Sequence, residues 1–195
     1  AVYKMAKVIE AIRTLEPTHH PVLGDGILEL TDIKSAPYPG ASVVPEYCRA
    51  TYDRRLLVGE TKESVLAPIQ ELLDKLMAED PQLKAKVSYA VGKEQCYTGN
   101  EITGERFFPG WLYDEKDEFV QDVKKELEGM GYTPEITQYN FCTNGSHYAG
   151  EAGIKTFGLG PSKENLAHTV NEYIEIDQLT KVTDCYYGVM KALLK

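Results

Sequence analysis

The residue best suited to metal chemistry is His168, which stands in a polar segment expected to form a loop. Neutral imidazole is a common zinc ligand, and Glu172, four residues later, could orient the ring from a second shell of contacts. A lone loop histidine is more often an ordinary surface residue, and a catalytic zinc needs about three protein ligands. Three further histidines show no diagnostic spacing: His19, His20 and His147. Spacing alone therefore makes His168 a candidate only.

Two glycine-containing segments could line a ligand pocket. Residues 143–147 read Thr-Asn-Gly-Ser-His and follow an expected strand, and strand ends are where α/β proteins place ligands. A plain turn explains that segment equally well. Gly158 and Gly160 resemble part of a phosphate loop, but a third glycine is missing and Pro161 follows in place of a helix start. This pattern gives phosphate binding little support.

Arg55 ends an expected strand and shares one face of it with Asp53. An ordinary surface ion pair between the two side chains would contribute little to stability. Alternatively, the forked guanidinium of Arg55 could bind a substrate carboxylate or a developing oxyanion. The residues alone leave both interpretations open.

The pattern of apolar residues predicts two groups of elements that would position these candidates. The first group has the order α-β-β-α-β, which is a split βαβ layer lacking its first strand. Its helices run to about Leu15 and onward from Thr61, and its strands cover residues 27–33, 41–57 and 84–91. The second group alternates helices and strands, which is typical of an α/β layer structure. It comprises a helix over 117–128, strands over 137–142 and 154–159, an extended segment at 173–176, and a last helix capped by Asp177 with Val182, Tyr186, Val189 and Leu193 on one stripe.

Composition excludes several classes of partner. The chain has 195 residues and a formal net charge of −9, and its Lys and Arg residues do not cluster among aromatic ones. We therefore expect no nucleic-acid and no membrane partner, and no apolar run approaches the roughly 20 residues that span a bilayer. The four cysteines form no Cys-x-x-Cys pair, so we expect a reducing, cytoplasmic location.

Three segments together resemble the zinc-dependent hydrolases of peptidase family M20, which includes aminoacylase, acetylornithine deacetylase, succinyl-diaminopimelate desuccinylase and glutamate carboxypeptidases. Residues 40–45 with Asp53-Arg54-Arg55 are similar to the family's lid motif. Residues 97–99 and 108–111 are similar to its selenium-metabolism-linked branch. Residues 143–146, followed by 153–161 and 167–172, resemble the C-terminal signature, and the resemblance covers essentially the whole chain.

This resemblance implies a catalytic α/β domain carrying an inserted ferredoxin-like lid that mediates homodimerisation. It implies a site with two Zn²⁺ ions, or Co²⁺ or Mn²⁺, which cleaves an amide, N-acyl or peptide-like bond with metal-activated water. His168 corresponds to a metal ligand, with Glu172 behind it. The substrate, a small molecule or a peptide, would be bound by Arg55, Ser42, Gly145, Ser146 and Gly160.

The resemblance also implies that much of the site lies elsewhere. The remaining metal ligands, the general base and the lid's first strand all correspond to positions before residue 1. Two residues depart from the family pattern: Ser42 stands where the family has Asn, and Ser162 where it has Gly. Both changes fall in segments that would recognise the substrate.

We therefore expect a C-terminal fragment, with a lid and dimerisation domain over 1–92 and the end of a catalytic α/β domain over 93–195. The helical pattern that starts at Ala1 without a capping residue agrees with that expectation. On this hypothesis the fragment itself holds no zinc tightly and is inactive. The alternative is a non-catalytic dimerisation module of the same fold. The carboxylates encoded before Ala1 would distinguish the two hypotheses.

Overall fold

The computed structural model describes residues 1–194 and divides the chain into two compact units, Ala1–Gly110 and Trp111–Lys195. The first unit extends past residue 92 and so includes a hairpin that we had expected in the second domain. The assignment of the units to a lid and a catalytic portion stays a prediction. No helix in the described part of the chain has the length and apolar character needed to cross a membrane.

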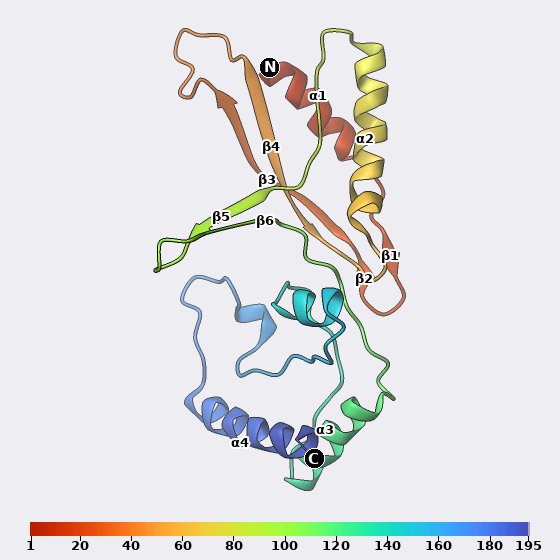
Figure 1. The fold of residues 1–195 in the computed structure, drawn as a ribbon, viewed down its shortest axis with the longest axis vertical. Coiled ribbons are helices and arrows are strands. Elements are labelled where there is room, and N and C mark those ends of the chain that lie inside the picture. The colour runs from red at the N-terminus through yellow and green to blue at the C-terminus, as the bar shows by residue number, and fades with distance from the viewer. Residues whose placement is uncertain (195) are drawn as a thin grey trace. The chain divides into compact units, whose positions relative to one another are not determined.

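The first unit consists of a long antiparallel hairpin, two helices and two smaller hairpins (Figure 1). In the long hairpin, Ile27 pairs with Arg55 and Ala36 with Tyr47, with a bulge between Leu30 and Asp32. The bounds are α1 Val2–Ile12, β1 His19–His20, β2 Gly24–Asp25, β3 Ile27–Ala36, β4 Tyr47–Arg55, α2 Lys62–Glu79, β5 Val91–Gln95 and β6 Glu101–Glu105.

Helix α2 begins at a capping box formed by Thr61 and Ser64. The Thr61 hydroxyl accepts the backbone N–H of Ser64 at 3.2 Å, and the Ser64 hydroxyl accepts that of Thr61 at 2.9 Å. These bonds satisfy donors that a helix start leaves without partners. Pro68 lies inside the helix, which continues to Glu79.

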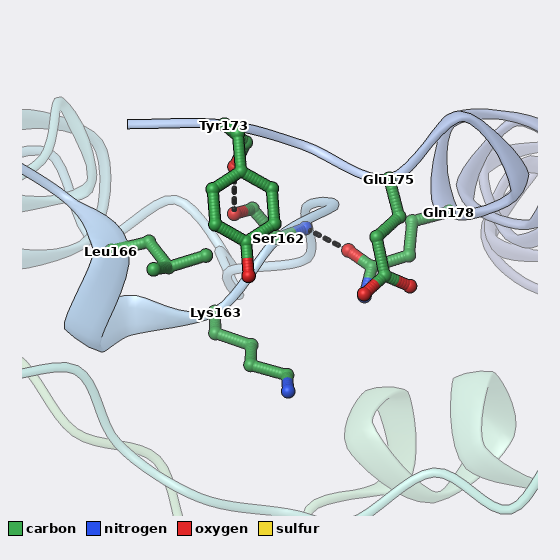
Figure 2. A pocket seen from close by; sticks show the side chains of 6 residues that line it. All are labelled: Ser162, Lys163, Leu166, Tyr173, Glu175 and Gln178. Atoms are coloured by element: carbon green, nitrogen blue, oxygen red, sulfur yellow. Dashed lines mark hydrogen bonds between the residues drawn. The ribbon is translucent and has the colours of Figure 1, made fainter. Parts of the chain in front are cut away.

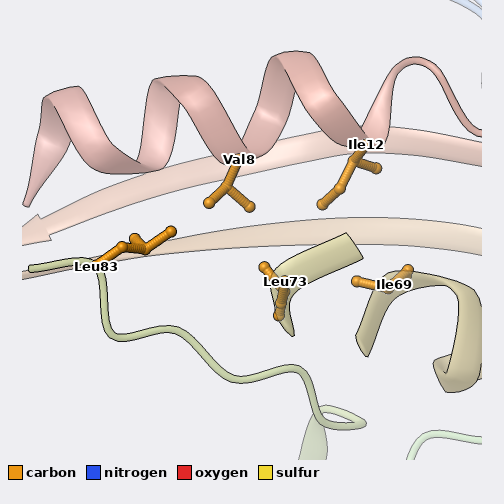
Figure 3. Packing of buried hydrophobic residues seen from close by; sticks show 5 residues of the cluster. All are labelled: Val8, Ile12, Ile69, Leu73 and Leu83. Carbon is orange, nitrogen blue, oxygen red and sulfur yellow. The ribbon is translucent and has the colours of Figure 1, made fainter. Parts of the chain in front are cut away.

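Both helices of the first unit pack on one apolar cluster (Figure 3). Its buried members come from α1, α2 and the segment after α2: Val8, Ile12, Ile69, Leu73 and Leu83. Leu28 of β3 and Tyr52 of β4 pack against the same cluster, so the long hairpin and both helices share one core. Burial of apolar area here supplies the main stabilisation of this unit.

The expected strand over 84–91 is only partly correct, because the paired strand β5 begins at Val91. Exposure alternates as expected, with Ala85, Val87 and Tyr89 turned inward. Within the described chain, however, residues 84–89 make no backbone–backbone hydrogen bond. A ladder requires a neighbouring strand at hydrogen-bonding distance, and no such neighbour lies beside this segment.

The second unit contains two long helices and two short ones, connected by extended segments. Helices α3 and α4 pack through Val123, Leu127 and Ala192, which form its buried cluster. The bounds are α3 Glu118–Gly129, a π-helix η1 over Ser146–Glu151, a 3₁₀-helix η2 over Glu164–Leu166, and α4 Ile176–Leu193. The helix expected over 117–128 is confirmed as α3, and its buried stripe is formed by Phe119, Val123 and Leu127.

The strands expected over 137–142 and 154–159 do not form ladders among the described residues. Their polar backbone groups instead find partners of other kinds. The N–H of Asn140 donates to the Glu164 carboxylate at 2.9 Å, and the carbonyl of Leu159 accepts the Tyr186 hydroxyl at 3.1 Å. A central-sheet strand needs strands on its flanks, and this unit supplies none.

The start and the buried face of α4 also differ from expectation. Glu175 is the N-cap, and Asp177 lies in the first turn, where it accepts a hydrogen bond from Lys181 that lowers the pKa of its carboxyl. Tyr186 and Leu193 are 44% and 43% exposed. Val182 is buried as expected, but α3 meets the face that carries Cys185, Val189 and Ala192, so the helix is rotated relative to the expected stripe.

Candidate functional site

The segment around His168 has an unusual backbone. His168, Asn171 and Ser162 adopt φ values of 61°, 63° and 80°, in the left-handed region that non-glycine residues rarely occupy. Such conformations cost of order 1–3 kcal/mol each and cluster at functional sites. Three of them within ten residues therefore single out residues 162–171 as a candidate site.

His168 is exposed, and Glu172 binds its backbone. The carboxylate of Glu172 accepts the backbone N–H of His168 at 3.2 Å, closing a tight turn. This contact holds the main chain that carries the imidazole. Orientation of the imidazole by Glu172, as the sequence led us to expect, stays a prediction.

Ser162 is held from two sides at the edge of a small, shallow hollow (Figure 2). Its N–H donates to the side-chain oxygen of Gln178 at 2.6 Å, and its hydroxyl donates to the carbonyl of Tyr173 at 3.3 Å. The hollow is further lined by Lys163, Leu166 and Glu175. The φ of 80° explains why a glycine suits this position, and the two hydrogen bonds help hold a serine there.

Gly145 and Ser146 form a tightly packed turn at the start of η1. A Cβ on Gly145 would lie 2.7 Å from Cζ2 of Trp111, so the ring leaves room only for glycine. Ser146 is 5% exposed, and its hydroxyl lies 3.6 Å from the Cys142 thiol. The backbone at these two predicted pocket residues is therefore closely packed.

The π-helix η1 brings His147 and Glu151 together. The Nδ1 atom of His147 lies 2.7 Å from a carboxylate oxygen of Glu151, and both side chains are about half exposed. The carbonyl of His147 accepts the N–H of Ala152, the wide turn typical of a π-helix. Such turns are rare and occur frequently at functional sites. Sequence reasoning found no signal for this pair.

Gly160, a predicted substrate residue, is exposed, and a Cβ there would meet nothing within 4 Å. The crowded glycine is Gly158, where a Cβ would lie 2.2 Å from the Tyr139 ring. Burial raises the pKa of the Tyr139 hydroxyl, and the nearby Glu164 carboxylate adds to the shift. Packing therefore requires Gly158, although the pattern of residues could not distinguish it from Gly160.

The two candidates of the first unit lie at opposite ends of β4. Ser42 is exposed in the loop before the strand, and Arg55 ends it, where its guanidinium donates to Asp53 at 2.8 Å. From Tyr47 to Arg55 the strand spans roughly 27 Å at about 3.4 Å per residue. One small substrate cannot contact both side chains of the same protomer.

The second unit contains the other five candidates: Gly145, Ser146, Gly160, His168 and Glu172. Among these the structure joins Gly145 to Ser146 and His168 to Glu172. Within residues 1–194, no three His, Cys, Asp or Glu side chains gather closely enough to hold a metal ion. The described residues therefore do not fit a catalytic zinc by themselves.

Comparison with known proteins extends these observations. The profile of Peptidase family M20/M25/M40 matches residues 10–192. The chain belongs to this family. It is 31% identical over 175 residues to the uncharacterized protein YgeY of Escherichia coli strain K12, a match covering 88% of this chain and 42% of that protein.

Two similar M20 proteins have named activities. The N-formyl-4-amino-5-aminomethyl-2-methylpyrimidine deformylase of Halalkalibacterium halodurans is 28% identical over 196 residues, covering 94% of this chain and 43% of that enzyme. The succinyl-diaminopimelate desuccinylase of Hydrogenovibrio crunogenus is 25% identical over 154 residues, covering 78% and 35%. The chain thus spans less than half the length of these relatives.

Proposed function

We propose that this chain is the C-terminal part of a longer, metal-dependent M20 hydrolase that cleaves an amide, N-acyl or peptide-like bond. The observation that carries the proposal is the family match over residues 10–192, which includes the strained segment around His168. Relatives named for removing a formyl and a succinyl group support an acyl–nitrogen bond as the target. The four unbridged cysteines agree with a cytoplasmic location.

In this proposal His168 contributes one metal ligand, and the other ligands and the general base come from the remainder of the longer polypeptide. A metal pair would polarise the scissile carbonyl and activate a water molecule. Zinc is the metal we propose, with cobalt or manganese as substitutes. Glu172 holds the backbone of His168, and the turn at Gly145 and Ser146 would line the substrate pocket.

We further propose that the first unit is a ferredoxin-like lid with room for one more strand. Among residues 1–194, the segment 84–89 and the outer edge of β4 both lack ladder partners, although Val87 and Tyr52 pack on the same core. The Tyr52 hydroxyl and the Nε of Arg54 are buried without a hydrogen-bond partner. A strand placed between the two edges would satisfy their backbone groups.

The lid also leads us to propose a homodimer. Ser42 and Arg55 are too far apart to meet one substrate within a protomer, so a shared role requires a second copy. Light scattering on the longer protein at tens of micromolar, near the weak end of specific affinities, should give the mass of a dimer. A monomeric mass at that concentration would contradict this part of the proposal.

The function is tested by assaying the longer polypeptide against N-acyl amino acids and small peptides, with the 195-residue chain in parallel. We expect hydrolysis by the former and none by the latter. Arg55→Ala should weaken mainly the use of carboxylate-bearing substrates. If the longer polypeptide cleaves no such bond in the presence of zinc, cobalt or manganese, the alternative of a non-catalytic dimerisation module is favoured.

A further inference from the structure

Asn144 differs from the other asparagines of the chain in the residue that follows it. A side-chain-bearing residue follows each of the others: Glu after Asn100 and Asn171, Phe after Asn140, and Leu after Asn165. Asn144 is followed by Gly145, which has no Cβ to hinder an approach to its own backbone nitrogen. Asn144 is also exposed, in the turn that precedes η1. The pair therefore combines an exposed side-chain amide with a backbone nitrogen that carries no neighbouring side chain.

Such a pair has the atoms needed for deamidation without an enzyme. The Gly145 nitrogen attacks Cγ of Asn144, the new N–Cγ bond closes a succinimide ring, and the Cγ–Nδ2 bond breaks. The proton of the Gly145 nitrogen leaves with Nδ2 as ammonia. Water then opens the ring, giving Asp where the new bond is cleaved and isoaspartate where the main-chain carbonyl is released from the nitrogen. No oxidation or reduction occurs, and water is the co-reactant.

The folded turn restrains the nitrogen that must attack. The N–H of Gly145 donates to the Thr143 hydroxyl at 3.1 Å. The Trp111 ring covers the Gly145 backbone so closely that a Cβ there would lie 2.7 Å from Cζ2. The Asn144 carbonyl, in the same peptide group as the Gly145 nitrogen, accepts the N–H of His147 at 3.0 Å. Ring closure moves this peptide group and removes its proton, so the turn must open locally before the reaction can occur.

Either product would change the charge and packing of this turn. Residues 143–150 contain no Asp, Glu, Lys or Arg, so a carboxylate at position 144 would be the first formal charge of either sign from these residue types in the segment. Isoaspartate also lengthens the main chain by a methylene group. The close contact of Trp111 with Gly145 leaves little room for that extension. Deamidation would therefore disturb the backbone of the turn as well as its charge.

We propose that Asn144 is a modification site at which the chain deamidates itself through the Gly145 nitrogen, and that the hydrogen bond from Gly145 to Thr143 restrains this reaction in the folded protein. The inference does not rest on the proposed hydrolase function, because it uses only the residue types and the contacts of this turn. The reaction proceeds from molecules in which the turn has opened, so its rate increases as the turn loses stability.

Peptide mass spectrometry of the 195-residue chain, incubated at neutral pH with and without urea, measures the reaction at each asparagine. We expect slow conversion at Asn144 in the folded chain and faster conversion in urea, with both Asp and isoaspartate among the products. Asn100 and Asn171 serve as internal controls and should convert more slowly than Asn144 in urea, because Glu follows each. Asp as the sole product in urea, or equal conversion at Asn100 and Asn144 there, would overturn the attack by Gly145.

Two variants of Thr143 test the restraint, with circular dichroism to establish that each is folded. Thr143→Val keeps the shape of the side chain but removes the acceptor, and it should accelerate deamidation of the folded chain about fivefold, the factor that one net hydrogen bond contributes. Thr143→Ser keeps a hydroxyl and should react at nearly the rate of the unchanged chain. In urea all three chains should react alike. No acceleration in folded Thr143→Val, or equal rates for the unchanged chain with and without urea, would refute the restraint.

Discussion

At the scale of single residues, close packing distinguishes Gly158 from Gly160, although the family motif contains both. A Cβ on Gly158 would overlap the Tyr139 ring, whereas one on Gly160 would enter open space. The sequence alone does not show why the motif has a glycine at each of these two positions. The structure assigns a packing role to the first and leaves the second available for ligand contact.

This difference predicts the stability of two matched variants. Gly158→Ala forces the Tyr139 ring or the backbone to move, and we expect it to lower the free energy of unfolding by about 1–3 kcal/mol. Gly160→Ala should change it by less than about 0.5 kcal/mol. Urea unfolding monitored by tyrosine and tryptophan fluorescence measures both. Equal losses in the two variants would show that the ring does not pack on Gly158.

Two adjacent arginines on β4 illustrate how burial decides the strength of an ion pair. Arg54 and Glu60 are 20% and 10% exposed and lie 2.5 Å apart, and the same carboxylate accepts the backbone N–H of Leu57 at 2.6 Å. Arg55 and Asp53 are 39% and 48% exposed. Water therefore screens the attraction within the second pair more strongly than within the first.

We therefore expect Glu60→Gln to destabilise the first unit by about 2–3 kcal/mol, because it leaves the Arg54 charge buried without its counter-charge. Asp53→Asn also replaces a carboxylate by an amide, but it should lower the free energy of unfolding by less than about 1 kcal/mol. Chemical denaturation of the two variants under identical salt gives the comparison. A cost for Asp53→Asn as large as that for Glu60→Gln would mean that the exposed pair is structurally important.

At the scale of elements, local patterns predicted helices better than strands. The start of α2 near Thr61 and the range of α3 were predicted to within one residue, because a helix satisfies its own backbone within a few residues. The segments at 84–89, 137–142 and 154–159 show why strands failed. Pairing depends on a neighbour distant in sequence, which periodicity cannot supply.

The candidate site divides in the same way. The motif predicts site roles for His168, Gly145 and Ser146, whereas the residue types at Ser162 and His168 do not reveal their left-handed backbone. The contact of His147 with Glu151 depends on a π-turn that no local preference predicts. Residue identities therefore nominated the candidate residues, which stay predictions, and three-dimensional contacts were needed to show how their backbone is held.

The unpaired segment 84–89 gives a prediction at this scale. In the 195-residue chain its amides should exchange with solvent much faster than those of β3 and β4, because no ladder protects them. In the longer protein the same amides should become protected if a strand fills the gap beside β4. Hydrogen–deuterium exchange measures both states. Slow exchange of residues 84–89 in the chain alone would contradict the vacant strand position.

At the scale of the whole molecule, membership of the M20 family and the limited span of the chain lead to one account. The chain covers less than half of each relative described above, and its described residues gather no metal-binding cluster. We propose that polypeptide outside this sequence completes the catalytic centre. In that account the 195 residues supply the lid, one metal ligand and part of the substrate pocket.

The most direct test of this central claim is the metal content of three proteins: the longer polypeptide, its His168→Ala variant and the 195-residue chain. Inductively coupled plasma mass spectrometry should find close to two metal ions in the first, fewer in the second and none bound tightly by the third. Hydrolysis should fall by at least roughly a hundredfold in His168→Ala, since an open catalytic site cannot easily spare a ligand. Stoichiometric zinc in the 195-residue chain alone, or full metal content and activity in His168→Ala, would contradict the account.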